Sequence, residues 1–327
     1  MAIKTRFFLT SDTHGRVFDV KPTFKADVAI HCGDLTGRSE LEKLRDTIDM
    51  MRKIPAPLKL VIAGNHDLLL EEGERFAELK SMSMSSSRDP ARVDRTIGPA
   101  GAGRQLFEQA KADGVYFLDE GNYTFTLQNG ACLRIYASPW TPAKWTGRAY
   151  QYPPETKHDF AIDDGTQVVV SHGPPLGVFD NTSFGRAGDP NLFTSVAIAR
   201  PMLHCFGHIH SGWGAMLATW RSPRPRARPR YTDLNTEKSL VIEEMSNLAK
   251  NSNDTDKEAK ARADKTKAIQ DQGFAHTSHC SGDAHPLRPT EQTLFVNASY
   301  DWSESGWAGG LGEKPPWLVD LELPKAE

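Results

Sequence analysis

Several apolar, strand-like runs in this chain each end directly in side chains that can bind a metal ion. One is "VIAGNHD", residues 61–67, in which an apolar run breaks into Gly, Asn, His and Asp with no spacer. Alone, this ending predicts a turn, because Gly and Asn tolerate the left-handed backbone region and Asp bonds its own main chain. The same design recurs in "FFLTSDTHG", "ADVAIHCGDLT", "TQVVVSHGPP" and "MLHCFGHIH". A turn alone does not explain such a repetition.

The expected strands and their spacing favour a layered α/β fold. Runs of β-branched and aromatic residues bounded by turn residues predict strands at 6–10, 28–31, 58–63, 115–118, 167–170, 202–206, 293–296 and 317–323. The segment "YTFTLQNGACLRIYASPW" predicts a hairpin that turns at Asn129-Gly130. The denser strands after residue 115 predict a second, more antiparallel sheet.

Two helices follow from capping signals. Residues 39–54 fit a helix with Ser39 as the N-cap and Glu42 three residues later. In "GDPNLFTSVAIARP", Asp189 can cap a helix and Pro201 ends it. Strand and helix therefore alternate over the first 70 residues, as in an α/β layer.

Strand ends of this kind can converge on one site. In layered α/β folds, ligands collect outside the carboxyl ends of the strands. The side chains there are two Asp, one Asn and four His, with His66 left over. Oxygen and imidazole donors without a thiolate suit manganese, iron or zinc, or a mixed pair. Two such ions about 3.5 to 4 Å apart could hold an attacking and a leaving oxygen in line on one phosphorus.

The five motifs, taken together and in this order, resemble the calcineurin-like metallophosphoesterase superfamily. Its pattern runs Asp-x-His, Gly-Asp, Gly-Asn-His-Asp/Glu, His and Gly-His-x-His, and all five blocks occur between residues 12 and 210. The segments "IYASPW", "SHGPPLGVFD" and "TLFVNAS" resemble those of the small metallophosphoesterase-domain-containing branch. The resemblance implies one domain over residues 1–327, with two packed β-sheets flanked by helices in an α/β/β/α sandwich.

The resemblance also implies roles for individual residues. It implies one metal ion held by Asp12, His14, Asp34 and His210, and a second held by Asp34, Asn65, His172 and His208, with Asp34 as the bridge. His66 would lie outside the ligand set, hydrogen-bonded to Asp67, and protonate the leaving group. Arg16 and Arg38 follow motif residues closely and are candidates for neutralising a substrate phosphate, although a surface role fits them equally.

The preferred interpretation is a dinuclear metal-dependent hydrolase of phosphate esters. The resemblance favours a phosphodiesterase that acts on small nucleotide-type substrates by attack of a metal-bridging hydroxide. A protein Ser/Thr phosphatase is the first alternative, but "GDLTGRS" lacks the acidic residue that accompanies the second block in that family. A nuclease is a further alternative. A metal-stabilised scaffold is the alternative from another class, and the spare His66 counts against it.

Charge and cysteine content set the expected surroundings. The net charge of −3 and pI near 6.4 indicate no membrane partner and give no support to a nucleic-acid partner. No apolar run approaches the roughly 18 residues of a membrane span, so we expect a soluble protein. Cys32, Cys132 and Cys205 lie in strand-like runs, which predicts buried, reduced thiols and a cytoplasmic location.

Two stretches carry none of the motifs. Residues 81–104 are rich in Ser, Gly and Arg and predict a surface loop. Residues 221–290 begin with the basic, proline-rich "RSPRPRARPR" and continue with a long polar tract. This composition predicts a partly disordered insertion, which is also the expected site for any protein partner.

Overall fold

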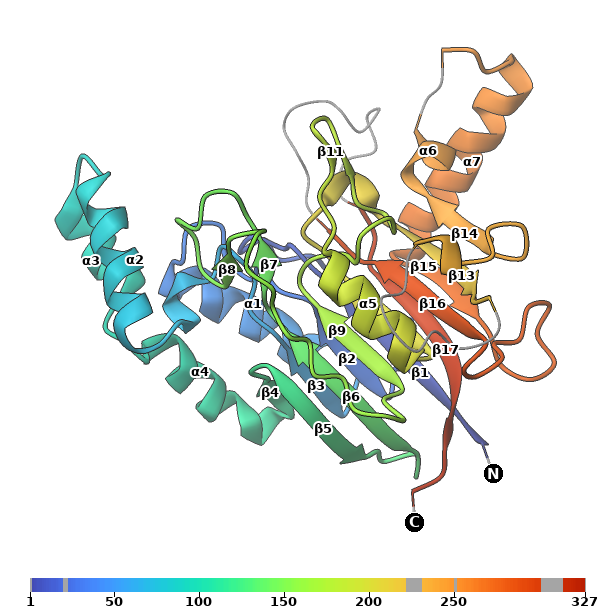
Figure 1. Cartoon of the computed structure of the whole chain (residues 1–327), viewed down its shortest axis with the longest axis horizontal. Helices are drawn as coiled ribbons and strands as arrows, with labels where there is room; N and C mark the ends of the chain where they lie inside the picture. Colours follow the sequence, from blue (N-terminus) through green and yellow to red (C-terminus); the bar gives the residue numbers. More distant parts are fainter. Residues whose placement is uncertain (1, 20–22, 222–230, 250–251, 301–313, 327) are drawn as a thin grey trace.

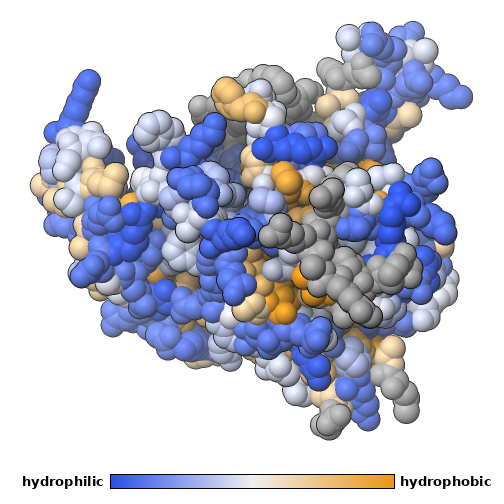
Figure 2. Space-filling model, viewed as in Figure 1, coloured by the Kyte–Doolittle hydropathy of each residue, from blue (hydrophilic) through white to orange (hydrophobic). Residues whose placement is uncertain are grey.

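Two β-sheets lie face to face at the centre of the molecule, and helices cover their outer faces (Figure 1). The structure is a computed structural model that describes residues 2–19, 23–221, 231–249, 252–300 and 314–326. The predicted pair of packed sheets flanked by helices is confirmed. On the face drawn in Figure 2 the surface is mostly hydrophilic, with apolar residues in small groups.

The first sheet is mostly parallel. Its six strands, in spatial order, are β15 (Ala275–Ser278), β17 (Trp317–Pro324), β1 (Ala2–Thr10), β2 (Val28–His31), β3 (Leu58–Val61) and β4 (Val115–Phe117). Strands β1 to β4 run parallel, and β17 is antiparallel to β1 and parallel to β15.

The second sheet has a parallel centre and antiparallel edges. Its seven strands, in spatial order, are β14 (Leu240–Glu244), β13 (Gly214–Thr219), β16 (Gln292–Asn297), β12 (Leu203–Phe206), β9 (Val168–Ser171), β6 (Cys132–Ser138) and β5 (Gly121–Thr126). Strands β16, β12, β9 and β6 are parallel to one another. The second sheet has three antiparallel strand pairs and the first has one, so the prediction of a more antiparallel second sheet is confirmed, although its centre is parallel. The β5–β6 hairpin is confirmed as well.

Alternation along the strands separates the inner core from the outer layers. In β2, Val28 and Ile30 join the cluster between the sheets, whereas Ala29 joins the cluster beneath the helices. In β9, Val168 and Val170 face the inner cluster, and Val169 faces the opposite helix layer. Period-2 burial on both faces explains why these strands are continuous apolar runs.

The helices form two outer layers and one projecting unit. Helices α1 (Leu41–Lys53), α2 (Gly73–Ser85), α3 (Pro90–Ile97) and α4 (Ala102–Ala110) lie on the side of the first sheet, and α5 (Pro190–Ala199) covers the second. Helices α6 (Met245–Leu248) and α7 (Asp256–Gln272) project beside β14 (Figure 1). No helix within the described ranges is both long and apolar enough to cross a bilayer.

Short elements connect these layers. They are η1 (Leu68–Leu70), η2 (Lys111–Asp113), η3 (His210–Gly212), η4 (Tyr231–Asp233) and the two-residue strands β7 (Thr141–Pro142), β8 (Gln151–Tyr152), β10 (Asn181–Thr182) and β11 (Gly185–Arg186). Strand β7 pairs with β8, and β10 pairs with β11.

The predicted cap of the first helix is wrong. The N-cap of α1 is Glu40, and no side chain caps the helix. Ser39 has a positive φ of 59° and binds the turn that follows β3 instead. Its Oγ donates to the His66 carbonyl at 2.7 Å and accepts from the Leu68 N–H at 2.9 Å. The Asp189 cap of α5 is confirmed.

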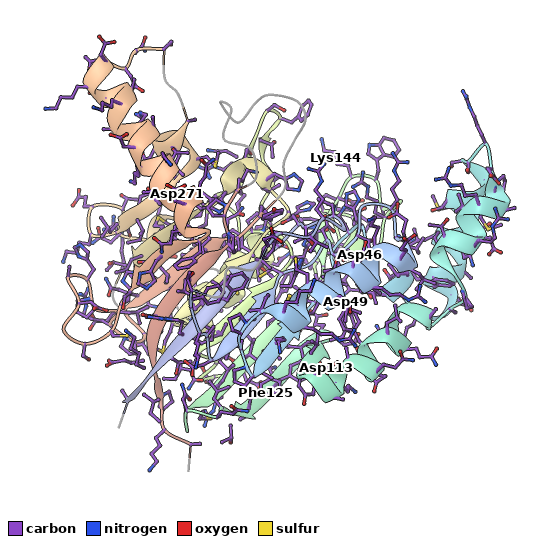
Figure 3. All side chains as sticks on the ribbon, turned by 180° about the vertical axis from the view of Figure 1, so that it is seen from behind. Asp46, Asp49, Asp113, Phe125, Lys144 and Asp271 are labelled. Atoms are coloured by element: carbon purple, nitrogen blue, oxygen red, sulfur yellow. The ribbon has the colours of Figure 1, made fainter. Side chains whose placement is uncertain are left out.

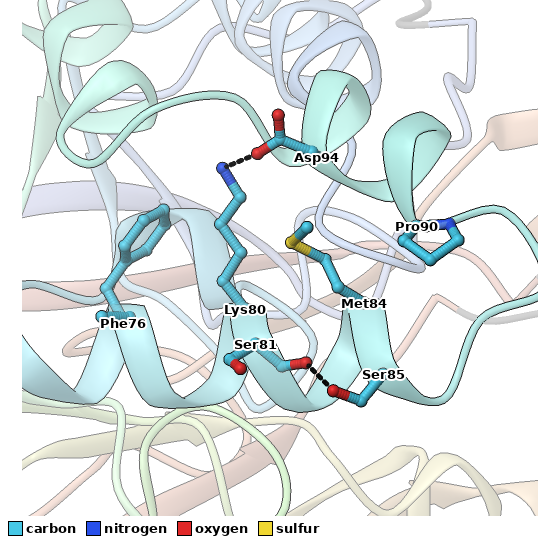
Figure 4. Close-up of a pocket in the computed structure, with 8 residues that line it drawn as sticks. Phe76, Lys80, Ser81, Met84, Ser85, Pro90 and Asp94 are labelled. Carbon is cyan, nitrogen blue, oxygen red and sulfur yellow. Dashed lines mark hydrogen bonds and ion pairs between the residues drawn. The ribbon is translucent and has the colours of Figure 1, made fainter.

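The predicted surface loop over residues 81–104 is also wrong, because the stretch contains the end of α2, all of α3 and the start of α4. Serine hydroxyls in α2 donate to carbonyls four residues earlier, as Ser85 does to Ser81 at 2.8 Å (Figure 4). Between α2 and α3, Lys80 pairs with Asp94 at 2.7 Å beside a groove that both apolar and polar side chains line.

The described parts of residues 221–290 are more ordered than the sequence predicts. Strands β14 and β15 form edges of the two sheets, and α7 begins at a capping box between Thr255 and Glu258. Residues 222–230, which hold most of the basic tract, lie outside the described residues.

Candidate metal centre

The predicted ligand side chains meet where parallel strands of both sheets end. The first sheet contributes Asp12 and His14 after β1, Asp34 after β2 and Asn65 after β3, and the second contributes His172 after β9 with His208 and His210 after β12. Parallel strands direct their carboxyl ends to one edge. Residues almost 200 positions apart therefore lie within contact distance, as His208 and Asp12 do.

The first donor group surrounds Asp12, which is fully buried. Its carboxylate accepts from the His208 N–H at 3.0 Å and from Ser299 Oγ at 2.9 Å. His210 Nε2 lies 3.4 Å from Asp12 Oδ1 and 3.4 Å from His14 Nε2. The donor atoms of Asp12, His14 and His210 all lie within 4.8 Å of one another, so they can converge on one ion.

The second donor group surrounds Asp34. His172 Nε2 lies 3.4 Å from Asp34 Oδ1 and 3.0 Å from Asn65 Oδ1. The donor atoms of Asp34, His172 and His208 lie within 4.8 Å of one another. Asp34 also belongs to a further group with His14 and His66. One carboxylate is thus shared between neighbouring donor groups.

The loops that carry these residues adopt an unusual backbone conformation. Four of the candidate residues have positive φ, namely Asp12 (54°), His14 (49°), Asp34 (55°) and His208 (66°). Residues other than Gly rarely adopt this region, and such strain concentrates at functional sites. The four left-handed residues therefore mark the loops as shaped for this arrangement.

Two glycines of the motifs are required by close packing at the site. A Cβ atom on Gly64 would lie 2.3 Å from the backbone N and Oδ1 of Asp34. A Cβ atom on Gly207 would lie 2.1 Å from Oδ2 of Asp12. Neither carboxylate could keep its position if a larger residue replaced the glycine.

The electrostatics of the group favour a bound cation. Burial alone would raise the pKa of Asp34. The neighbouring His172 and His66 have the larger, opposite effect and hold the pKa of Asp34 below its usual range. Burial likewise opposes a charge on His172, yet Asp34 outweighs it and raises the pKa of His172 to about 9. A metal ion that binds this imidazole would displace its proton. Oxygen and imidazole donors around buried carboxylates fit manganese, iron or zinc.

His66 is oriented by a backbone carbonyl. Its Nδ1 lies 2.7 Å from the carbonyl oxygen of Gly37, which can only accept, so Nδ1 carries a proton. Its Nε2 faces the guanidinium group of Arg148 and lies 4.0 Å from Asp34 Oδ2. The ring therefore points Nε2 towards the candidate metal centre.

The predicted hydrogen bond between His66 and Asp67 is wrong. The Asp67 carboxylate accepts from the N–H groups of Leu35, Thr36 and Gly64 at 2.9 to 3.0 Å, and from the Thr36 hydroxyl at 2.9 Å. Burial, with a contribution from Asp34, raises the pKa of Asp67 to about 6. Asp67 thus ties the loop after β3 to the loop after β2, and its predicted catalytic role stays a prediction.

The two predicted substrate arginines lie on the loops beside the candidate ligands. Arg16 is half-buried, and its backbone N–H donates to the carbonyl oxygen of Thr13 at 2.8 Å. Arg38 is exposed, and its backbone N–H donates to Glu40 Oε2 at 2.9 Å. Their roles in substrate binding stay predictions, as do the individual ligand roles and the acid role of His66.

Sequence reasoning missed two residues of the site. Ser299 follows the carboxyl end of β16, so the rule that located the ligands could have located it too. Arg148 lies between two-residue strands and has no sequence signal that links it to His66.

Comparison with known proteins agrees with this geometry. The family model described as calcineurin-like phosphoesterase matches residues 5–212, which is more than half of the chain. Metallophosphoesterase domain-containing protein 1 of Homo sapiens is 29% identical over 223 residues, which cover 65% of this chain and 62% of the relative. The chain thus spans less than two thirds of the length of that relative.

Two further relatives carry different names. A UPF0046 protein of Caenorhabditis elegans is 29% identical over 213 residues, 63% of either chain. A probable rhamnogalacturonate lyase C of Emericella nidulans is 30% identical over 219 residues, which cover 66% of this chain but 18% of that protein.

Proposed function

The chain belongs to the calcineurin-like phosphoesterase family, and we propose that it is a metal-dependent hydrolase of phosphate esters. The shared position of Asp34 supports this proposal most directly, because its carboxylate belongs to two neighbouring donor groups. A shared carboxylate between sets of imidazoles suits a pair of metal ions rather than a single structural ion.

The chain offers a donor set for each ion of such a pair. The resemblance implies that Asp12, His14, Asp34 and His210 would hold one ion, and that Asp34, Asn65, His172 and His208 would hold the other. In support, the donor atoms of Asp12, His14 and His210 lie within 4.8 Å of one another, and His14 Nε2 lies 3.9 Å from Asp34 Oδ2. On the other side, His172 Nε2 lies 3.0 Å from Asn65 Oδ1. When bound, the two ions would supply Lewis-acid stabilisation of phosphoryl charge and a water that is nucleophilic at neutral pH. The left-handed loops and motif glycines keep these donors in place.

His66 is the proposed proton donor to the leaving oxygen. Its Nδ1 proton is bonded to the Gly37 carbonyl at 2.7 Å, so the proton for the leaving oxygen would be carried by Nε2 of the protonated ring, the atom that accepts from Arg148 in this structure. A general acid matters most for a basic leaving group such as a ribose alkoxide, and it contributes about 10² to 10⁴ in rate. The presence of this spare imidazole supports an enzyme over a scaffold.

We further propose that the substrates are small phosphodiesters of the nucleotide type. The resemblance of "IYASPW", "SHGPPLGVFD" and "TLFVNAS" to the small metallophosphoesterase branch supports this preference. A protein phosphatase is the alternative, and relative turnover of cyclic nucleotides and phosphopeptides would distinguish the two.

The test is metal dependence of ester hydrolysis. Chelator-treated protein should lose turnover of a nitrophenyl phosphodiester and regain it with Mn²⁺ better than with Mg²⁺, because imidazole donors disfavour magnesium. Metal analysis of the reconstituted protein should give two ions per chain. Full turnover by metal-free protein would contradict the proposal.

A further inference from the structure

The loop that joins β7 to β8 lies at the same end of the molecule as the candidate metal centre. Figure 3 labels Lys144 of this loop at the end where the parallel strands finish, opposite Asp113 and Phe125. Residues 143–150 include Lys144 and Arg148 and contain no acidic residue. The loop therefore presents positive charge near the candidate donors.

The end of this loop is anchored to the segment that follows His66. The Tyr150 N–H donates to Glu71 Oε1 at 2.7 Å, and the Tyr150 hydroxyl donates to the Leu70 carbonyl at 2.6 Å. Both partners follow His66 within five residues. Arg148 and His66 are thus held in one local framework.

A second anchor acts on the loop backbone around Arg148. The guanidinium group of Arg75, in α2, donates to the carbonyl oxygens of Thr146 and Arg148, the latter at 3.3 Å. Two carbonyl contacts from one guanidinium fix the backbone on either side of Gly147. The position of Arg148 is therefore set by several contacts rather than by its own side chain.

The Arg148 side chain points its charge at the site. One of its terminal nitrogens, Nη1, contacts Nε2 of His66, and the residue is exposed. A guanidinium group has five N–H donors and no acceptor. Among the described residues, no Asp or Glu forms an ion pair with Arg148. The group is an uncompensated cation beside the imidazole that faces Asp34.

We propose that Arg148 donates hydrogen bonds to the non-bridging phosphoryl oxygens of the substrate on the His66 side of the centre. Arginine suits this role because its planar fork matches two phosphate oxygens at once. The ligand class is thus an anionic phosphoryl group. This inference rests on the proposed phosphoesterase function and adds a substrate-contacting residue that none of the five motifs contains.

The test compares Arg148→Ala with Lys144→Ala in protein loaded with Mn²⁺. Lys144 is the matched control, because it is an exposed cation of the same loop. Two quantities are measured: KM for a nitrophenyl phosphodiester, and the inhibition constant of inorganic phosphate. A charge-assisted contact to phosphate predicts that Arg148→Ala raises both about 10- to 100-fold. Lys144→Ala should change each less than about threefold, as expected for a screened surface charge.

Two further measurements make the result specific. Arg148→Lys should recover only part of the phosphate affinity, because an ammonium group lacks the bidentate fork. Guanidinium ion added to Arg148→Ala should partly restore turnover, whereas it should leave the Lys144 variant unchanged. Metal content should be the same in all of these proteins.

The outcomes separate this inference from the proposed function. Phosphate inhibition that is unchanged in Arg148→Ala would overturn the inference, and a fall in kcat alone would assign Arg148 to positioning His66. Equal effects of the Arg148 and Lys144 variants would also overturn it, in favour of general charge attraction. Failure of the metal-loaded wild-type protein to hydrolyse any ester would instead refute the proposed function.

Discussion

Asp34 and Asp320 are both almost fully buried carboxylates, but the chain surrounds them with different partners. Asp320, in β17, is 1% exposed and accepts from Arg6 at 2.6 and 2.8 Å. Lys4 lies 3.0 Å from it, and His276 lies 3.4 Å from it. Its negative charge is thus compensated by permanent cations that the chain itself supplies.

Asp34 is 2% exposed and has no such partner. Among the described residues its ionic neighbours are imidazoles, with His172 at 3.4 Å and His14 at 3.9 Å. A buried charge needs compensation, and neutral imidazoles are metal ligands. Burial of a carboxylate alone therefore does not indicate a metal site. The imidazole partners of Asp34 do, because an imidazole that is protonated without metal, such as His172, can exchange its proton for a metal ion.

The largest expected effect comes from removing Asp34, the buried carboxylate whose partners are imidazoles. Asp34→Ala removes a donor from both groups, and loss of several kcal/mol of charge stabilisation corresponds to on the order of 10³-fold in rate. Turnover of a nitrophenyl diester and metal content by elemental analysis are the measurements. We expect turnover to fall by at least this factor and fewer than two ions to remain. A variant that still binds two ions would show that Asp34 is not the bridge.

The next largest effect tests whether His66, beside Asp34, is a metal ligand or a proton donor. His66 Nε2 lies 4.0 Å from Asp34 Oδ2, and the residue shares a donor group with Asp34. If His66 is the acid, His66→Asn should slow hydrolysis of a nucleotide diester by about 10² to 10⁴. A nitrophenyl ester should be slowed far less, because nitrophenolate leaves without a proton. Loss of a metal ion, or equal slowing of both esters, would make His66 a ligand or a positioning residue.

Much of this site could be predicted from the sequence because strand order determines it. Each motif follows a strand, and parallel strands end at one edge, so Asp12 and His210 could be expected at the same end of the molecule. That they are neighbours, 3.4 Å apart, depends also on how the two sheets pack against each other. The same reasoning located the two sheets. It could not assign Asp67, because which donors reach a carboxylate depends on the path of the loop after β2.

The other wrong predictions concern helical segments that bury few side chains. The helix over residues 90–97 begins with Asp89 and Pro90, the same signature that located α5 at Asp189 and Pro190, but the serine-rich surroundings obscured it. Helix α7 has no buried residue, so its sequence lacks an apolar stripe. Arg148 approaches His66 from a loop that is anchored by long-range contacts to Glu71 and Arg75, which no local sequence signal announces.

The compensated carboxylate should affect stability and leave chemistry almost unchanged. Burial opposes the charge on Asp320, but hydrogen bonds from Arg6, His276 and Lys4 outweigh it and hold its pKa below the usual range. Asp320→Asn should therefore lower the free energy of unfolding at pH 7 by about 1 to 3 kcal/mol. Denaturant unfolding measures this loss, and metal content and KM for the diester should stay at wild-type values.

The pH dependence gives the sign of that contribution. A depressed folded pKa stabilises the protein above the unfolded value of about 4, and the contribution is lost as pH falls through the folded pKa. The difference in unfolding free energy between wild type and Asp320→Asn should thus be constant near neutral pH and shrink below about pH 4. A gap that widens in acid would contradict the ion-pair assignment.

The smallest effect is expected at Asp271, a solvent-exposed carboxylate whose charge water already stabilises. Asp271, near the end of α7, pairs with Lys267 at 2.8 Å, but both side chains are about two thirds exposed or more (Figure 3). Water already solvates both charges, so the pair adds little to stability and is screened by salt. Asp271→Asn should leave the unfolding midpoint, the metal content and the turnover unchanged within experimental error. A loss comparable to that of Asp320→Asn would mean that burial is not what separates these carboxylates, and that the contrast between Asp34 and Asp320 needs another cause.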